Sequence, residues 1–145
     1  TAWVPFTAMD EKIGTISFVE GSLHWPENNH LNFFSSDLDG LEQQFNSGGA
    51  EVVKVPAVLT RGQVTFHHCR TIHGSGPNLT DAPRRSIALH LQPASNSHRA
   101  IGSNGQAVGH STDELTRDAD GHPNYADPTY CPTVGQFSPT QTLRA

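Results

Sequence analysis

Hydrophobic and polar residues alternate in several short stretches of this chain, with the period of two that is typical of β-strands burying one face. In the clearest stretch, Ile16 and Phe18 share one face, while the residues between and beside them share the other. Glycines and prolines separate the stretches and mark turns. The pattern predicts five strands, over residues 2–9, 14–19, 51–55, 62–69 and 84–91.

The same alternation assigns side chains to the faces of these strands. Along residues 62–69, Thr65 and His67 share one face, while Phe66 and His68 share the opposite face. His67 and His68 therefore cannot both bind one ion. In the last strand, three apolar residues are expected to point inward to a core, namely Ile87, Leu89 and Leu91.

One short helix is predicted near the middle of the chain. Leu38, Leu41 and Phe45 follow each other at helical spacing and would form its apolar face. Asp37 or Ser36 can cap its start, because their side-chain oxygens accept hydrogen bonds from the first free amides. A pair of glycines follows and is expected to end the helix.

The other segments are rich in polar residues, glycine and proline. Residues 26–36 predict a loop, residues 73–78 a tight turn, and residues 113–117 a short helix within a long polar segment. We therefore expect one domain over residues 1–145, with a barrel core in residues 1–93 and a loop-rich tail in residues 94–145. Short strands, Gly/Pro turns and a single helix indicate a mainly all-β fold, a barrel or sandwich.

Composition and charge exclude several classes of protein. The formal net charge of −5 argues against a nucleic-acid partner, which would need a basic face. No basic run exceeds Arg84-Arg85, and no stretch approaches the roughly 20 apolar residues of a membrane helix. Two cysteines are too few for a disulfide framework, so free thiols are expected. We expect no membrane partner and a cytoplasmic location.

Nine histidines are a mild excess for 145 residues and raise the hypothesis of a metal site. The chain contains no Cys-x-x-Cys and no His-Glu-x-x-His, so a structural zinc site has little support. A two-His, one-carboxylate iron site usually begins with His-x-Asp or His-x-Glu, and no histidine here has an acid two positions later. Neither a nucleophile elbow nor a phosphate-binding glycine loop is present.

The segment from Gly62 to His90 resembles the C-terminal signature of the phytanoyl-CoA dioxygenase family. Its run Phe-His-His-Cys-Arg-Thr-Ile-His-Gly-Ser-Gly-Pro-Asn contains His73 at the position of the histidine that ligates iron in the family. The family has an arginine eleven positions later that binds the far carboxylate of 2-oxoglutarate, which is Arg84 here. Ser75 matches the hydroxyl that helps this arginine hold the carboxylate. The N-terminal Thr-Ala-Trp also resembles a family strand, and Trp3 would form a wall of the pocket.

This resemblance implies a double-stranded β-helix, or jelly-roll, of the cupin-like kind. It also implies an Fe(II)- and 2-oxoglutarate-dependent dioxygenase that releases succinate and carbon dioxide and hydroxylates an aliphatic C–H bond of a small molecule. Arg84 suits the carboxylate, because a guanidinium presents a planar fork of donors and stays charged. We expect Arg84 and His73 on adjacent strands of the barrel.

The chain departs from the family pattern in one important respect. The His-x-Asp pair of the family should precede the Ala-Trp strand, and it would therefore lie before Thr1. We expect the chain to be a fragment with an incomplete barrel, weak or absent iron and 2-oxoglutarate binding, and little activity by itself. Incomplete sheets leave open edges, so a homo-oligomer is possible.

Plain structural alternatives accompany each of these roles. His73 could be a buried turn residue, Arg84 a surface charge opposite Asp81, and Trp3 a core residue. A second hypothesis for the whole chain is a non-catalytic β-barrel module that serves binding or assembly. A third is a cupin-like protein that binds sugar or metal through scattered histidines.

Overall fold

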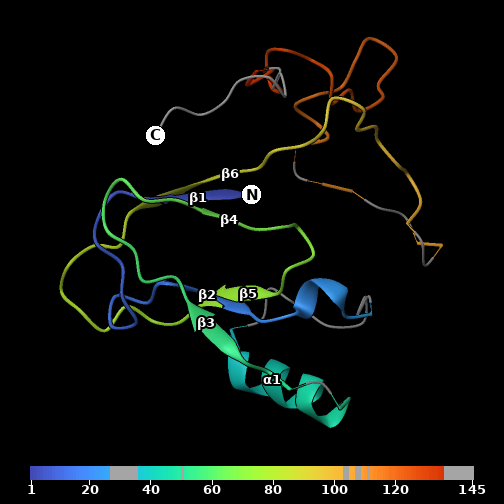
Figure 1. The fold of residues 1–145 in the computed structure, drawn as a ribbon. Helices are drawn as coiled ribbons and strands as arrows, with labels where there is room; N and C mark the ends of the chain where they lie inside the picture. The colour runs from blue at the N-terminus through green and yellow to red at the C-terminus, as the bar shows by residue number, and fades with distance from the viewer. Residues whose placement is uncertain (27–35, 50, 103–104, 107–108, 111, 136–145) are drawn as a thin grey trace, which may run out of the picture. The chain divides into compact units, whose positions relative to one another are not determined.

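The computed structural model describes residues 1–26, 36–49, 51–102, 105–106, 109–110 and 112–135. Contacts within the chain divide it into two compact units, Thr1–Leu91 and Gln92–Ala145. The first unit contains every strand and the α-helix that the described residues form (Figure 1). Most of the loop expected at residues 26–36 lies outside the described part of the chain.

One antiparallel sheet has the order β4-β1-β6, and its three strands lie side by side in Figure 1. Its central strand β1 (Ala2–Pro5) pairs with β4 (Thr65–Phe66) on one side and with β6 (Ser86–Leu89) on the other. Trp3 stands opposite Thr65 and Ala88, so these three residues share one face. The opposite face carries Phe66 and Leu89, which both stand opposite Ala2.

A second antiparallel sheet has the order β3-β2-β5. Strand β2 (Ile16–Val19) lies between β3 (Lys54–Pro56) and β5 (His73–Ser75). Phe18 stands opposite both Val55 and His73, so these side chains share a face. The two sheets lie one above the other in Figure 1, with loops connecting them.

A small hydrophobic core fills the space between the two sheets. Trp3 from the first sheet and Ile16 from the second both belong to it, together with Met9, Ile13 and Ala57 from the connecting segments. Phe18 and Leu59 pack against this cluster. The described residues thus form two small antiparallel sheets without a closed barrel, which confirms the predicted mainly β, incomplete jelly-roll fold.

Helix α1 (Leu38–Ser47) covers the predicted helical segment and extends it by two residues. Asp37 caps it as predicted, because its Oδ1 accepts a hydrogen bond of 2.9 Å from the Gly40 amide. The helix ends at Gly48. Its buried Phe45 packs on Trp25 with ring centroids 5.4 Å apart. Trp25 follows the short 3₁₀ helix η1 (Ser22–His24).

Three local predictions are wrong. Residues 73–75 form strand β5 and not a turn, because their backbone pairs with β2. Residues 113–115 form turns and Arg117 forms an isolated bridge with Pro123, so residues 113–117 are not a helix. The third concerns the side chains of the last predicted strand, which do not point inward. Ile87, Leu89 and Leu91 are exposed by 42%, 45% and 53%.

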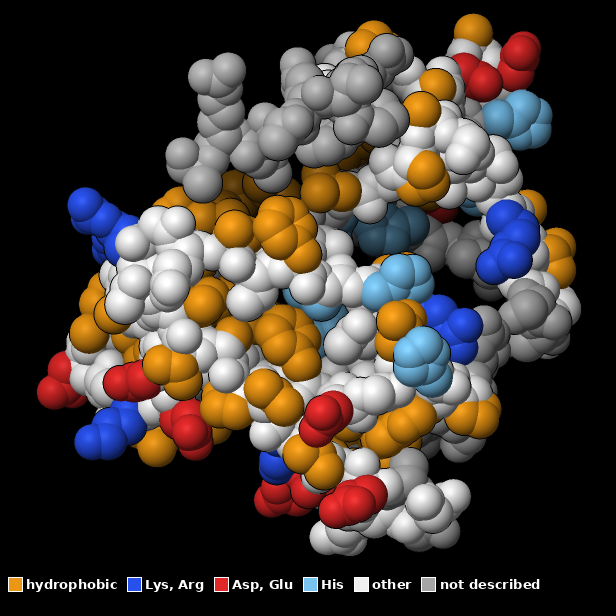
Figure 2. Space-filling model, viewed as in Figure 1, with side chains coloured by type: hydrophobic (Ala, Val, Ile, Leu, Met, Phe, Trp, Pro, Cys, Tyr) orange, Lys and Arg blue, Asp and Glu red, His pale blue; other side chains and the backbone are white. Residues whose placement is uncertain are grey.

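The register explains these exposed side chains. Trp3 occupies the inner face of β1 and stands opposite Ala88, so the residues on either side of Ala88 must face outward. Phe66 reaches the same outer face and is 72% exposed. Hydrophobic side chains are visible over much of the molecular surface in Figure 2.

Two further expectations concern cysteines and membranes. Cys69 and Cys131 are both free thiols, as predicted. Within the described residues, no helix has the length and apolar character needed to cross a membrane.

Candidate functional site

His73 lies on β5, opposite Phe18 of β2, and its side chain points from that sheet toward the first one. Its Nδ1 lies 2.7 Å from the carbonyl oxygen of Thr71. Because a carbonyl oxygen only accepts hydrogen bonds, Nδ1 must carry the proton in this arrangement. The lone pair of neutral His73 is therefore on Nε2. Metal-binding histidines are commonly oriented by such a hydrogen bond from the second ring nitrogen.

His67 is the closest aromatic neighbour of His73 among the described ring pairs. The two ring centroids are 4.6 Å apart, and the Phe18 ring lies 4.9 Å from His67 on the other sheet. The Nδ1 atom of His67 is buried and has no hydrogen-bond partner among the described residues. Burial lowers the pKa of His67 below its ordinary value of 6.5, and the nearby His73, the Thr1 amine and His90 lower it further. These surroundings therefore favour the neutral form of His67.

Ser75 and Trp3 lie on the strands that also position the histidines. Ser75 is exposed, stands opposite Ile16, and is two residues from His73 on the same face of β5. Trp3 is only 7% exposed and belongs to the core between the sheets. Trp3 is thus packed as a core residue. Its side chain lies on the face of β1 that is turned toward the sheet carrying His73.

Arg84 lies in the loop just before β6, not on an adjacent strand to His73. The expectation of adjacent strands is wrong, because β5 pairs with β2 and β6 pairs with β1 in the other sheet. The Arg84 guanidinium donates a hydrogen bond to the carbonyl oxygen of Gly14. No ion pair joins Arg84 to Asp81 within the described part of the chain.

Gly14 is held at a crowded crossing of two loops. Its φ of 74° favours glycine, and a Cβ placed on it would lie 2.6 Å from the Gly76 carbonyl oxygen and 2.7 Å from that of Pro77. The loop that follows β5 therefore packs directly on the turn that precedes β2. This contact fixes where the chain between His73 and Arg84 runs.

These residues meet only part of the requirement for an iron centre. His73 offers one suitably oriented nitrogen, and its donor type suits iron. Among the described residues, no group of three or more His, Cys, Asp or Glu side chains is arranged to hold a metal ion. The described part of the chain thus does not form the complete two-His, one-carboxylate triad.

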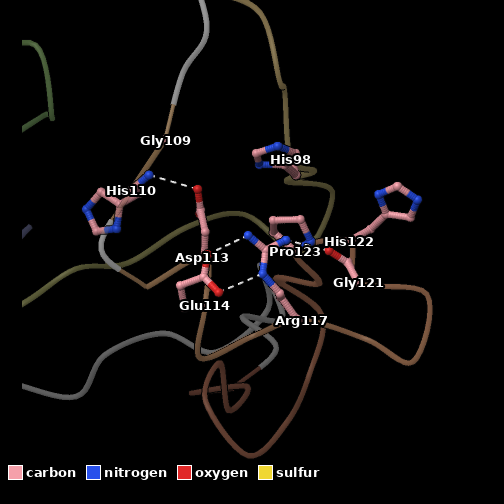
Figure 3. Close-up of a pocket in the computed structure, with 9 residues that line it drawn as sticks. All are labelled: His98, Gly109, His110, Asp113, Glu114, Arg117, Gly121, His122 and Pro123. Atoms are coloured by element: carbon pink, nitrogen blue, oxygen red, sulfur yellow. Dashed lines mark hydrogen bonds and ion pairs between the residues drawn. The ribbon is translucent and has the colours of Figure 1, made fainter.

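A separate hollow lies wholly within the second unit. It has a volume of about 570 Å³ and is lined by both charged and imidazole side chains (Figure 3), among them His98, His110, Asp113, Arg117 and His122. Two of its charged groups, Arg117 and Glu114, form an ion pair. Arg117 donates to Glu114 and to the Gly121 carbonyl oxygen. No predicted site residue lines this hollow.

Asp113 organises the loops around that hollow. Its carboxylate accepts hydrogen bonds from the Tyr125 hydroxyl and from the His110 amide, the latter at 2.8 Å. The Tyr125 hydrogen bond, followed by that of His110, lowers the pKa of Asp113 below its ordinary value. The same bond raises the pKa of Tyr125. The arrangement accounts for a buried carboxylate in a polar segment.

Sequence reasoning did not select His67 or Gly14 for the site. Alternation placed His67 on the face of Thr65, and the register confirms that this face is the inner one. That position could have signalled a role for His67, had the pairing of β4 with β1 been known. Nothing in the sequence around Gly14 indicates that Arg84 would bind its carbonyl, since 70 residues separate them.

The described residues thus form an open, mainly β fold with His73 on one sheet and Arg84 just before a strand of the other. The family model for phytanoyl-CoA dioxygenase matches residues 1–86, more than half of the chain. The chain therefore belongs to the phytanoyl-CoA dioxygenase family. The match includes Trp3, His73, Ser75 and Arg84. Neither the curated proteins nor the solved structures contain a match.

Proposed function

We propose that this chain supplies the distal half of an Fe(II)- and 2-oxoglutarate-dependent dioxygenase site that hydroxylates an aliphatic C–H bond of a small molecule. The observation that carries the proposal is the orientation of His73 within a chain of this family. The Nδ1–H group of His73 donates a hydrogen bond to the Thr71 carbonyl oxygen, which leaves the lone pair of Nε2 to bind the metal ion. In this proposal, iron and 2-oxoglutarate are the cofactors.

Arg84 is proposed as the anchor of the 2-oxoglutarate carboxylate, assisted by the Ser75 hydroxyl. Its guanidinium donates a hydrogen bond to one backbone carbonyl oxygen, that of Gly14. A guanidinium has five N–H donors, so this bond leaves donors free for a carboxylate. Trp3 is proposed as an apolar wall behind the ligand.

The first prediction concerns the anchor. Arg84 is exposed in the structure, and in the proposed site the bound ligand would bury it. Replacing Arg84 by alanine should then weaken 2-oxoglutarate binding at least about thirtyfold, because truncating one partner of a buried charge pair costs about 2 kcal/mol or more. Isothermal titration of 2-oxoglutarate into the iron-loaded protein that carries the complete triad measures this. Arg85→Ala is the matched control, since Arg85 is the neighbouring exposed arginine. Equal affinities for Arg84→Ala and wild type would remove Arg84 from the site.

Turnover tests the reaction itself. The chain alone, given iron(II), 2-oxoglutarate and oxygen, is expected to produce little or no succinate, because the described residues supply one ligand of the triad. The protein that carries the complete triad is expected to produce succinate. Strong succinate formation by this chain alone would contradict the assignment of a half site.

A binding or assembly module is the second candidate, and one observation favours it. The outer face of the β4-β1-β6 sheet exposes large apolar side chains, including Phe66, Ile87 and Leu89. Exposed apolar faces and open sheet edges commonly mark surfaces that associate with other chains. In this reading the protein contacts a second copy of itself and performs no chemistry.

A further inference from the structure

The hollow of the second unit lies outside the residues that the family model matches. The match ends at residue 86, whereas the second unit begins at Gln92. The volume of the hollow, about 570 Å³, is typical of pockets that bind small molecules. Its lining combines an arginine, two acids and three histidines, namely Arg117, Asp113, Glu114, His98, His110 and His122 (Figure 3). The proposed oxygenase site uses none of these groups.

The acids of the hollow are paired within the unit. Both carboxylate oxygens of Glu114 accept hydrogen bonds from the Arg117 guanidinium, the one from Nε being 2.9 Å long. Asp113 accepts one hydrogen bond from the Tyr125 hydroxyl and one from the His110 amide. Every oxygen of the two carboxylates thus has a donor, which weakens both acids as sites for a cationic ligand.

The hydrogen-bonding capacity that remains in the hollow is mainly that of donors. A guanidinium has five N–H groups, and Arg117 uses three of them on Glu114 and on the Gly121 carbonyl oxygen. His98 packs near the Tyr125 ring, and the hydrogen bond of His122 to Asp118 comes from its backbone amide. Within the described part of the chain, the ring nitrogens of both histidines have no hydrogen-bond partner.

The three histidines decide the net charge of the hollow. With neutral imidazoles, its two acids and one arginine leave a net charge of −1, and three imidazolium rings would change that charge to +2. Histidine is the side chain that changes charge near neutral pH. A bound anion favours the imidazolium form, so anion binding in the hollow is linked to proton uptake.

We propose that this hollow binds a tetrahedral oxyanion, namely free phosphate or the phosphate group of a small molecule, through Arg117, His98 and His122. A phosphate group has three strong acceptor oxygens and a charge of about −1.5 to −2 at neutral pH, so it can accept from all three donor residues. Guanidinium donors form strong, charge-assisted hydrogen bonds with phosphate. The site shares no residue with the proposed oxygenase site, so each can fail without the other.

Sulfate is the first probe, because it is a tetrahedral dianion that does not itself titrate near neutral pH. Two-dimensional ¹H–¹⁵N spectra of the histidine rings in the full chain follow the titration at constant ionic strength, and single His→Gln variants assign the signals. The rings of His98 and His122 are expected to shift and to saturate at the same sulfate concentration. Sulfate should bind at least about tenfold more tightly at about pH 6 than at about pH 8, because binding takes up protons.

Variants of the donors test the residues. Arg117→Gln should weaken sulfate binding at least about tenfold, because hydrogen bonds to charged groups contribute about 1.5–3 kcal/mol. Arg99→Gln is the matched control, since Arg99 is an exposed arginine of the same unit that does not line the hollow. His122→Gln leaves the bonds of Arg117 to Glu114 and Gly121 in place. It should also weaken sulfate binding and reduce its pH dependence.

Inorganic phosphate, glycerol 3-phosphate and malonate then identify the ligand. Tighter binding of glycerol 3-phosphate than of inorganic phosphate supports an organic phosphate as the ligand, and equal affinities support free phosphate. Malonate binding as tightly as either would overturn the assignment of a tetrahedral oxyanion. Equal sulfate affinities of Arg117→Gln and Arg99→Gln, or shifts at His98 and His122 that never saturate, would overturn the site itself.

Discussion

Gly14 connects the two sequence segments that carry the candidate site. It accepts the hydrogen bond of Arg84 through its carbonyl oxygen, and its α-carbon lies directly under the loop at Gly76 and Pro77. Both roles depend on the absence of a side chain. The position therefore couples the geometry of the arginine to that of the strand that carries His73.

Replacing Gly14 by alanine should destabilise the protein by at least about 3 kcal/mol, because the left-handed φ costs about 1–2 kcal/mol and the Cβ overlaps two carbonyl oxygens. Urea unfolding measures the change in the free energy of unfolding. Gly21→Ala is the matched control, because Gly21 has a similar φ of 69° with no atom near its would-be Cβ. Equal losses in the two variants would refute the crowding at Gly14.

The neutral state of His67 has a consequence for stability. Its pKa in the folded protein lies below 6.5, its ordinary value, so the unfolded chain binds more protons at this residue as the solution becomes acidic. The contribution of His67 to stability is therefore fully present above about pH 6.5 and is lost as the pH falls through the folded pKa.

Replacing His67 by glutamine should flatten the dependence of stability on pH. Between pH 7.5 and pH 5, about the range in which a histidine titrates, the wild type should lose more unfolding free energy than His67→Gln. Urea unfolding across this range provides the measurement. A steeper slope in His67→Gln would show that the folded-state pKa is raised instead.

At the scale of elements, the local sequence determines α1 most completely. Asp37 caps the helix and Phe45 is its buried contact, and both were readable from spacing and residue type. Leu38, which the periodicity assigned to the same apolar face, is 43% exposed. The periodicity predicts which residues share a face, but the packing partners decide which of them is buried.

Phe45 should contribute much more to stability than Leu38. Phe45→Ala is expected to lower the free energy of unfolding by about 3 kcal/mol, because it removes a buried ring packed on Trp25. Leu38→Ala on the same helix should cost less than about 1 kcal/mol. Urea unfolding followed by tryptophan fluorescence compares them. Similar losses would mean that α1 packs through a different face.

The strands were harder to predict than the helix. The sequence marked the positions of β1, β2, β3, β4 and β6, although the observed strands are shorter. It failed for β5, where the Gly-Ser-Gly-Pro composition indicates a turn. Residues 73–75 are extended because β2 offers them a pairing partner 55 or more residues away in sequence. Such pairing is a tertiary interaction and overrides local preference.

At the scale of the whole molecule, the outer face of the β4-β1-β6 sheet is notable. Phe66 and Leu89 flank Ala2 on this face, and they are 72% and 45% exposed. Strands β4 and β6 form the edges of this sheet among the described residues. Exposed apolar residues beside open edges favour association between chains.

We expect the chain to self-associate through this face. Sedimentation velocity should show a concentration-dependent increase in mass for the wild type, and Phe66→Lys should shift the equilibrium to the monomer by placing a charge on the apolar face. Leu79→Lys is the control, because Leu79 is equally exposed but lies in a loop. A wild-type chain that stays monomeric at all concentrations would contradict this expectation.

The sequence by itself determined the properties that depend on neighbouring residues. Strand alternation, the Asp37 cap and the spacing from His73 through Ser75 to Arg84 are all encoded within short segments. That spacing also led to the family, which the match over residues 1–86 establishes. The mainly β fold followed from the same local signals.

The tertiary structure alone decided which of these segments meet. The pairing of β1 with β4 and β6 turned Ile87 and Leu89 outward, since Trp3 already occupied the inner face. The stacking of two sheets placed the ring centroids of His67 and His73 4.6 Å apart. Loop packing brought the Arg84 guanidinium within hydrogen-bonding reach of the Gly14 carbonyl oxygen. Side-chain alternation is a local property with a period of two, whereas strand partners are chosen by burial across the whole domain.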